Sequence, residues 1–463
     1  MRNRIKILIS ILLSAASLLT FVTLSSCAGN PKENKPSEEE EEKEPTITEK
    51  IEALYASGVS TTEQIKELRS LVWQEYAEKV ASEEPGRADE LKKNKVTYIT
   101  IGRTKMKVRT VVVGKAPEGG YPLFLVYHGG GYDPNDQHNE EQWSGMGTRY
   151  TQTGVAGIYV AIRSVSDHEV TGQIFSTDIS WKFYDRIIAD AILYMKANPD
   201  KVYIVGYSAG GDGVYRIAPA MADRLAAATM TAGHPGDTDA INLFNLPFYL
   251  NGAELDDAYN RNVETVKYAQ RLDALSKRFN GGFEHWTFLH YNKEHGVIGD
   301  NAKTKQSVIK DINAWLEAYN SGVKYTGGNK SVTTDAATLM TEHTRDPIPA
   351  RVLWNVQASR TKIRKDNCFY WLSCDAEEGV IDASYDRETN TVTIASVSKK
   401  VISQFKVYLN EDMVDLSKEV TVILPSGKKI TAKPEISLDL LRSTTAKRGD
   451  PSYQFCASIT VEP

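Results

Sequence analysis

One serine of this chain stands where the backbone has to turn sharply. In "VYIVGYSAGG", residues 202–211, an apolar run typical of a buried strand leads into "GYSAG", and a helical pattern follows. A G-x-S-x-G turn between a strand and a helix lifts its serine above the carboxyl edge of a sheet, with the side-chain oxygen near the helix N-terminus. The pattern favours Ser208 as a nucleophile, and a glycine-rich tight turn is the alternative.

A second motif, "HGGG", could bind the negative charge that such a nucleophile creates. It begins at His128, ends the apolar run "PLFLVYH", and contains the three glycines 129–131, called here the glycine loop. Residues without side chains let backbone N–H groups point at the oxyanion of a tetrahedral intermediate. We predict Gly129 and Gly130 as donors, together with the N–H of Ala209. A flexible loop with a buried histidine is the alternative, and His128 is not predicted to be a base because it belongs to this loop.

The order of these motifs resembles that of the α/β-hydrolase superfamily, over roughly residues 95–320. The "GYSAGG" turn is similar to that of the dienelactone-hydrolase-like and esterase branch, and to that of the related prolyl-oligopeptidase-type catalytic domains. The resemblance implies the chain order nucleophile, acid, histidine. It also implies an acid after the strand "LPFYLNG" and a histidine after the next strand.

The segment "GAELDDAYNRN" begins at the last residue of "LPFYLNG" and contains three acids, Glu254, Asp256 and Asp257. Asp256 is predicted to be the acid, because the resemblance implies an acid directly before a short residue, an alanine and a tyrosine. Adjacent side chains of a loop point in different directions. Asp257 is therefore expected to be solvated or to cap a helix that starts near Tyr259.

Two histidines follow in "FLHYNKEHGVIGD". His290 lies in an apolar strand and is typical of a packed core residue, whereas His295 lies in a polar loop before a glycine. His295 is predicted to be the base that takes the serine proton, with Asp256 orienting its imidazole. His234 is a candidate for lining the pocket, with a structural role as the alternative. Arg261 is a candidate for binding a substrate carboxylate, with a surface salt bridge as the alternative.

Strand and helix patterns alternate around these motifs. Extended runs alternate with helical patterns near 181–197, 209–223, 260–279 and 302–319. An amphipathic helix is predicted over 60–80, with Ser60 and Glu63 as a capping box. The alternation predicts an α/β fold, with a mostly parallel sheet and helices on both faces, over residues 48–322.

The pattern changes after residue 320. Segments with period two, such as "TVTIASV", "QFKVYLN", "EVTVIL" and "CASITVEP", succeed one another, and "LPSGKK" is a hairpin signal. They predict a C-terminal all-β, sandwich-like domain over residues 345–463 without a strong helical run. Its aromatic segment "CFYWLSC" could bind sugar or pack in the core, and "RGD", residues 448–450, could serve adhesion or occur by chance.

The N-terminus has the layout of a secretory signal. Basic residues precede the apolar run "ILISILLSAASLLTFVTL", and small residues lead into Cys27, which predicts a signal peptide over 1–26. "LSSC" resembles the lipobox of bacterial lipoproteins, which implies lipidation of Cys27 and an exported protein anchored at the outer membrane or cell surface. A plain signal peptide or an anchoring helix is the alternative. Residues 27–47 carry a glutamate block and are predicted to be a disordered acidic tether.

Composition limits the partners. The chain has 463 residues and a formal net charge of −5, and no cluster of Lys and Arg suggests nucleic acid. The three cysteines after Cys27, at 368, 374 and 456, permit one disulfide in an exported protein and show no C-x-x-C spacing, so no metal or cofactor is predicted. The membrane would be reached through the lipid anchor only.

The substrate is predicted from the loops around the serine. Segments 131–150 and 163–180 are polar, contain Trp143, and would roof an open pocket. They favour a small-molecule or glycan-linked acyl ester over a long-chain lipid. A peptidase of prolyl-oligopeptidase type is the alternative among enzymes, although its relatives usually take an oxyanion donor from a tyrosine instead of an "HGGG" loop. A non-catalytic surface binding protein is the alternative of another class.

Overall fold

The computed structural model describes residues 44–131, 137–165, 174–290, 293–295, 304–308, 312–323, 330–334, 336–357 and 366–463. Residues Thr46–Pro463 form one compact unit. The predicted signal peptide, Cys27 and nearly all of the predicted tether lie outside the described residues. Among the helices of the described ranges, none combines the length and the apolar character needed to cross a membrane.

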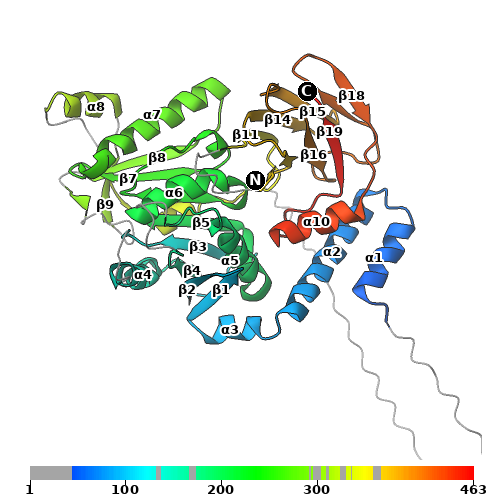
Figure 1. The fold of residues 1–463 in the computed structure, drawn as a ribbon, viewed down its shortest axis with the longest axis horizontal. Coiled ribbons are helices and arrows are strands. Elements are labelled where there is room, and N and C mark those ends of the chain that lie inside the picture. The colour runs from blue at the N-terminus through cyan, green and yellow to red at the C-terminus, as the bar shows by residue number, and fades with distance from the viewer. Residues whose placement is uncertain are drawn as a thin grey trace, which may run out of the picture. The chain divides into compact units, whose positions relative to one another are not determined.

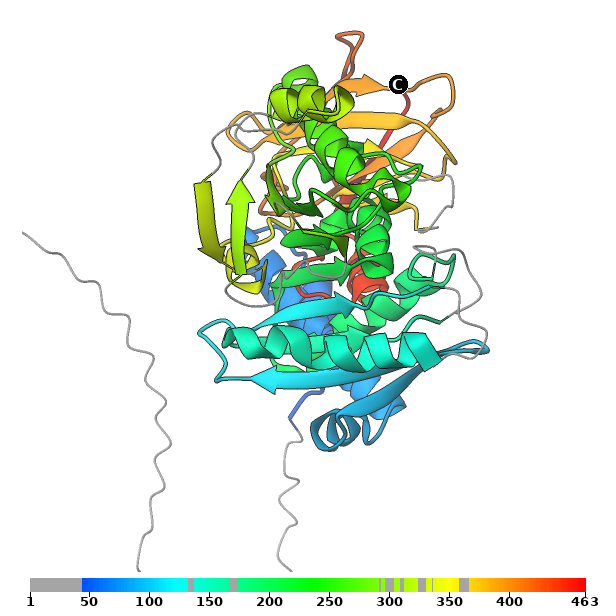
Figure 2. The same ribbon diagram turned by 90° about the vertical axis from the view of Figure 1, so that its left-hand side faces the viewer.

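The largest sheet of the described chain has the strand order β1-β2-β4-β3-β5-β6-β7-β8-β9-β10 (Figure 1). Its strands are β1 (Val96–Ile101), β2 (Thr104–Val113), β3 (Tyr121–Tyr127), β4 (Gly157–Ile162), β5 (Ala197–Tyr207), β6 (Ala227–Thr231), β7 (Phe248–Ala253), β8 (His285–His290), β9 (Thr304–Val308) and β10 (Lys330–Thr334). The strands from β4 to β8 pair in parallel, and the strands at both ends pair antiparallel. The antiparallel pair of β9 and β10, yellow-green in Figure 2, lies at one end of the sheet.

Helices cover both faces of this sheet because its central strands are apolar on both sides. In β3, Leu123 and Leu125 pack into the core formed with α5 (Ser180–Met195) and α6 (Ala209–Ala220). Phe124 and Val126 point to the other face, where α4 (Gln137–Arg149) and α9 (Ala336–Met340) contribute. Further helices of this part are α7 (Arg261–Phe279) and α8 (Ile312–Asn320). A buried, mostly parallel sheet between helices confirms the predicted α/β fold class.

Three local predictions are wrong. The capping box of the long N-terminal helix α2 (Thr62–Glu83) is formed by Thr61 and Gln64 rather than by Ser60 and Glu63, since the chain becomes helical one residue later. A helix was predicted near 302–319, but this part of the chain contains strand β9 and is helical only in α8. Most of the predicted roof segment 131–150 is α4, and its Trp143 is buried rather than open to a pocket.

The C-terminal part contains two sheets, in the orders β11-β14-β15-β17-β18 and β12-β13-β16-β19. Their strands are β11 (Arg351–Asn355), β12 (Cys368–Phe369), β13 (Leu372–Ser373), β14 (Val380–Asp386), β15 (Thr391–Val397), β16 (Phe405–Leu409), β17 (Val420–Ile423), β18 (Lys429–Ala432) and β19 (Ala457–Val461). The strands β17 and β18 form a hairpin at "LPSGKK", where the sequence predicted one. The aromatic segment at 368–374 is buried, as expected of core residues. The helix α10 (Leu438–Arg448), capped by Ser437, contradicts the expectation of no strong helical run.

The three cysteines of the C-terminal part are free thiols, and all three are buried. The sequence had permitted one disulfide among them, with one thiol left over. Their burial makes them part of the core of the two sheets.

Buried ion pairs join the C-terminal part to the α/β part. Arg224, which follows α6, donates to Asp450 at 2.6 Å, and Arg448 donates to Asp223 at 2.9 Å. Arg345 pairs with Asp450 at 2.9 Å, and the side chains of Arg448 and Asp450 are fully buried. The "RGD" tripeptide is therefore structural, because neither charged residue is accessible to an adhesion partner.

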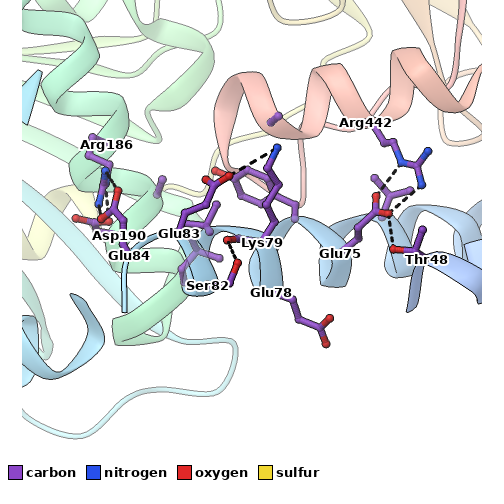
Figure 3. Close-up of a pocket in the computed structure, with 16 residues that line it drawn as sticks. Thr48, Glu75, Glu78, Lys79, Ser82, Glu83, Glu84, Arg186, Asp190 and Arg442 are labelled. Atoms are coloured by element: carbon purple, nitrogen blue, oxygen red, sulfur yellow. Dashed lines mark hydrogen bonds and ion pairs between the residues drawn. The ribbon is translucent and has the colours of Figure 1, made fainter. Parts of the chain in front are cut away.

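A cavity of about 1010 Å³ lies between α2, α5 and α10 (Figure 3). Its cations are each paired with carboxylates of the same lining. Arg442 bonds Glu75 at 2.8 Å, and Arg186 bonds Asp190 at 2.7 Å. Because its charges are matched internally, we interpret the cavity as a junction between helices.

The remaining N-terminal helices are α1 (Ile47–Ala56) and α3 (Arg87–Lys93).

Candidate active site

Ser208 occupies the strained turn between β5 and α6. Its φ of 56° and ψ of −120° are unfavourable for a residue with a side chain, and its N–H donates to the Thr231 carbonyl of β6 at 2.9 Å. The neighbouring glycines are needed for close approach. A Cβ on Gly206 would lie 2.2 Å from the Gly210 carbonyl oxygen, and a Cβ on Gly210 would lie 2.4 Å from that of Tyr127. The sequence therefore forces the serine out at the carboxyl edge of the sheet.

His295 and Asp256 meet Ser208 at this edge. His295 Nε2 lies 2.9 Å from Ser208 Oγ, and His295 Nδ1 lies 2.9 Å from Asp256 Oδ2. In the tautomer that satisfies both contacts, Nδ1–H donates to the carboxylate and Nε2 accepts the serine hydroxyl. The structure thus brings together the three side chains that the sequence had singled out, in the geometry of a nucleophile, a base and an orienting acid.

The two adjacent aspartates have different environments. Asp256 is buried, whereas Asp257 is exposed. Asp257 precedes the short helix η4 (Ala258–Asn260), where no side-chain capping hydrogen bond is found among the described residues, and Asn260 stands at the N-cap of α7. Of the two roles expected for Asp257, solvation fits and helix capping is wrong.

Arg261 lies beside the acid rather than in an open pocket. It is 6% exposed, and its Nη1 is 3.8 Å from Asp256 Oδ1. That carboxylate oxygen makes no hydrogen bond within the described residues. The guanidinium also lies 4.8 Å from the ring centre of Tyr259, which is 72% exposed. Arg261 is thereby placed to stabilise the acid rather than to reach a substrate.

Asp212 is a second buried carboxyl near the site that sequence reasoning missed. It lies one turn after Ser208 on α6 and accepts the His234 backbone N–H at 2.6 Å. Burial raises the pKa of Asp212 to about 6, although Arg261, Arg216 and His295 all favour its charged form. The signal that could have found it is an acid inside a helix that is otherwise apolar and glycine-rich. The pKa of His234 is lowered, chiefly by burial.

His290 is buried in β8, as the sequence suggested. Burial lowers its pKa to about 4, and Lys293 acts in the same direction. His290 is therefore neutral at ordinary pH, and it contacts neither Ser208 nor Asp256 through any hydrogen bond found among the described residues.

Tyr207 contacts His295, the predicted base, and the sequence gave no reason to expect this contact. It is the variable residue of the turn before the serine, its hydroxyl donates to the His295 carbonyl, and the two rings stack with centres 5.4 Å apart. The turn thus positions the histidine as well as the nucleophile.

The glycine loop adjoins the serine. A Cβ on Gly129 would lie 3.4 Å from Ser208 Cβ. His128 is buried, with Nδ1 on the Gly129 carbonyl and Nε2 accepting the Ser164 N–H at 3.3 Å, so it fixes the loop rather than acting as a base. The predicted donors, the N–H groups of Gly129, Gly130 and Ala209, have no acceptor in the part of the chain that the structure describes. The site therefore offers N–H groups beside a paired hydroxyl.

Within the described ranges, no group of three or more His, Cys, Asp or Glu side chains is placed to hold a metal ion.

Comparisons with known proteins give distant structural likenesses. No family model matches the chain, and no curated protein sequence matches it. A thermostable esterase is 14% identical, with a TM-score of 0.36, over 54% of this chain and 63% of its own, so the chain spans less than two thirds of that esterase. A poly(3-hydroxybutyrate) depolymerase from Bordetella parapertussis is 14% identical, with a TM-score of 0.35, over 55% of this chain and 96% of its own. An acylaminoacyl peptidase is 13% identical, with a TM-score of 0.30, over 43% of this chain and 37% of its own. At such low identities and TM-scores, the reaction has to be argued from the side chains of the site.

Proposed function

We propose that this chain is a serine hydrolase that cleaves a polar or carbohydrate-linked carboxylic ester. The observation that carries the proposal is the continuous contact from Ser208 Oγ to His295 Nε2 and from His295 Nδ1 to Asp256 Oδ2, each at 2.9 Å. A serine hydroxyl is a weak nucleophile until an adjacent base takes its proton. That activation is supplied by His295, which contacts the serine on one side and the buried acid on the other.

The proposed reaction has two halves. Ser208 Oγ attacks the acyl carbon while His295 takes its proton, and the carbonyl oxygen becomes an oxyanion that accepts N–H bonds from Gly129, Gly130 and Ala209. Collapse of this intermediate breaks the ester bond, and His295 returns the proton to the leaving alcohol. Water then attacks the acyl-enzyme by the same steps and releases the acid and free serine. Asp256 orients the imidazole and stabilises its cation throughout.

The glycine loop supports an ester rather than a peptide substrate. Its N–H groups provide the oxyanion site without a tyrosine donor, which the prolyl-oligopeptidase-type relatives usually need. We also propose that the protein is exported and held at a membrane by lipid on Cys27, on the strength of the "LSSC" pattern alone. Peptide cleavage and ligand binding without turnover are the outcomes that the experiment must separate from ester hydrolysis.

A fluorophosphonate probe and a substrate panel test the proposal. The wild-type chain should be labelled, and Ser208→Ala should not. Acetyl, feruloyl and short-chain acyl esters should be hydrolysed faster than aminoacyl amides. Faster amide cleavage would indicate a peptidase, and a wild-type chain without labelling or turnover would leave a binding protein.

The adjacent aspartates give a matched pair of variants for the acid. Asp256→Asn should lower kcat by about 10⁴, since the amide would hold the wrong imidazole tautomer. Asp257→Asn should change kcat by less than about tenfold, because this side chain is exposed and the carboxylate that pairs with His295 is that of Asp256. A crippled Asp257→Asn beside an active Asp256→Asn would mean that the acid is misassigned by one residue.

A further inference from the structure

We propose that Asn139, on the first turn of α4, is a positioning residue that holds the glycine loop in the shape that binds the oxyanion. The inference rests on the proposed serine hydrolase function and extends it to a side chain that would never touch the substrate. No feature of the sequence pointed to Asn139.

Asn139 pairs with one glycine through both ends of its amide. Its Oδ1 accepts the Gly131 N–H at 2.9 Å, and its Nδ2 donates to the Gly131 carbonyl. The side chain is fully buried, so water does not compete for either bond. A primary amide is suited to this pairing because it presents one donor and one acceptor side by side.

This pairing decides which N–H groups of the loop remain available. The Gly131 N–H is used by Asn139, and the Gly129 carbonyl is held by His128 Nδ1. The loop is therefore fixed at both ends by buried side chains, while Gly130 lies between them. The donors left to an oxyanion are the N–H groups of Gly129 and Gly130, and Gly129 is the residue that adjoins Ser208.

Gly130 shows how closely the loop fits against Asn139. Its φ is +110°, a conformation that side chains rarely adopt, and a Cβ there would lie 2.2 Å from Asn139 Oδ1. The loop has no side chains of its own with which to hold such a conformation. An outside partner has to supply the hydrogen bonds, and Asn139 is placed to do so.

Asn139 can serve as a fixed point because α4 is anchored to the sheet. One turn further along the helix, Trp143 is buried and its Nε1 donates to the Ala161 carbonyl of β4 at 2.9 Å. Glu140, the next residue, pairs with Lys107 of β2 and lies 3.5 Å from Arg163 Nε. The amide of Asn139 is thereby tied to β2 and β4, which belong to the same sheet as β5, the strand that leads into the serine.

Removal of the amide should slow the chemical step rather than weaken substrate binding. Donors aimed at the oxyanion act when charge develops in the transition state, so their misplacement lowers kcat and leaves KM nearly unchanged. For Asn139→Ala we expect kcat on p-nitrophenyl acetate to fall by roughly 10²–10³, with KM within about threefold of wild type. The affinity for phenylboronic acid, whose serine adduct places an oxygen in the same position, should fall in parallel. Gln137→Ala, on the exposed side of the same helix, should leave all three values unchanged.

Asn139→Asp gives a signature that a merely structural role would not produce. An ionised carboxylate can accept the Gly131 N–H, but its second oxygen would face the Gly131 carbonyl and repel it. A protonated carboxyl restores the pairing, with its O–H donating where the amide N–H did. Because burial raises the pKa of a carboxyl, this protonation falls within a workable pH range. The ratio of kcat for Asn139→Asp to kcat for wild type should therefore rise at least tenfold between pH 8 and pH 5.5.

The outcomes separate this inference from the function on which it rests. A wild-type chain that is neither labelled nor active removes the proposed function. An active wild-type chain with kcat for Asn139→Ala within threefold of normal, or a pH-independent ratio for Asn139→Asp, overturns the inference alone. If Asn139→Ala fails to fold by circular dichroism, the ratio for Asn139→Asp decides. Failure of both variants to fold would also overturn it, since Asn139 would then be required by the fold and not by the loop.

Discussion

Two buried titratable groups should give the free energy of unfolding opposite dependences on pH. Burial raises the pKa of Asp212 from an ordinary 3.8 to about 6, and it lowers the pKa of His290 from an ordinary 6.5 to about 4. Asp212 is 5% exposed and His290 is 4% exposed, so solvent screens neither group. Arg261, Arg216 and His295 oppose the effect of burial on the pKa of Asp212 without cancelling it. Lys293 acts on the pKa of His290 in the same direction as burial.

The signs follow from proton binding. The folded chain binds the Asp212 proton more tightly than the unfolded chain, so the contribution of Asp212 to stability is present below pH 3.8 and is lost as the pH rises to about 6. The folded chain binds the His290 proton less tightly, so the contribution of His290 is present above pH 6.5 and is lost as the pH falls to about 4. Each whole number of pKa corresponds to 1.36 kcal/mol, so each effect is about 3 kcal/mol. Between pH 4 and pH 6, the falling contribution of Asp212 and the rising contribution of His290 give the free energy of unfolding nearly equal and opposite slopes with pH, which nearly cancel in the wild-type chain.

Single substitutions should expose each slope. Asp212→Asn keeps an oxygen for the His234 N–H and removes the buried charge, so it should stabilise the fold by up to about 3 kcal/mol at pH 7.5 and by almost nothing at pH 4. The stability of this variant should rise with pH, as His290 alone requires. His290→Gln should do the reverse, with a gain near pH 4 and a stability that falls as the pH rises.

Urea unfolding of the three chains at several pH values between 4 and 7.5 measures these slopes. The double variant Asp212→Asn with His290→Gln is the control, and it should lack both slopes. If Asp212→Asn differed from wild type by the same amount at pH 4 and pH 7.5, the effect would come from packing or from lost contacts with the arginines. The reasoning from burial would then be refuted.

Two further predictions concern strain and buried charge. Ser208→Gly should be more stable than Ser208→Ala by about 1–2 kcal/mol in thermal unfolding, because glycine adopts the φ of 56° without strain; equal stabilities would mean that the turn stores none. Asp450→Ala should lose about 3–5 kcal/mol in urea unfolding, because it leaves Arg224 and Arg345 buried without this partner, whereas Asp415→Ala, which breaks the exposed pair with Lys418, should lose little. A small loss for Asp450→Ala would show that water or another carboxylate replaces it.

Local pattern was enough to predict the central strands of the large sheet and the serine turn. The second half of β5, residues 202–205, is an apolar run, and the glycines around the serine leave few other conformations for the chain. The segments that contain Asp256 and His295 were chosen through a family resemblance, and local pattern served only to prefer His295 over His290. Their contact joins positions 39 residues apart, a separation over which spacing alone carries no distance information.

The wrong predictions for α4 and β9 share a physical cause, which is that tertiary contacts outweighed local preference. The segment of α4 is polar and glycine-containing, yet Trp143 and Met146 find a sheet face to bury against and the segment becomes a helix. The residues of β9 have a helical pattern and become a strand because β8 and β10 offer edges to pair with. Asn139 gave no signal, since the value of its amide depends on a glycine eight residues away in a particular conformation.

The loops of the candidate site hold one another as well as being held by the sheet. In the acid loop, the Leu255 N–H donates to the Lys293 carbonyl at 2.9 Å and the Glu254 N–H donates to the His290 carbonyl at 3.1 Å. The histidine loop is bound in turn by the Tyr207 hydroxyl, which belongs to the serine turn. The distance between acid and base is therefore a joint property of three loops. A substitution in one loop should misplace groups carried by another, which is why the effects of such substitutions on kcat should not add.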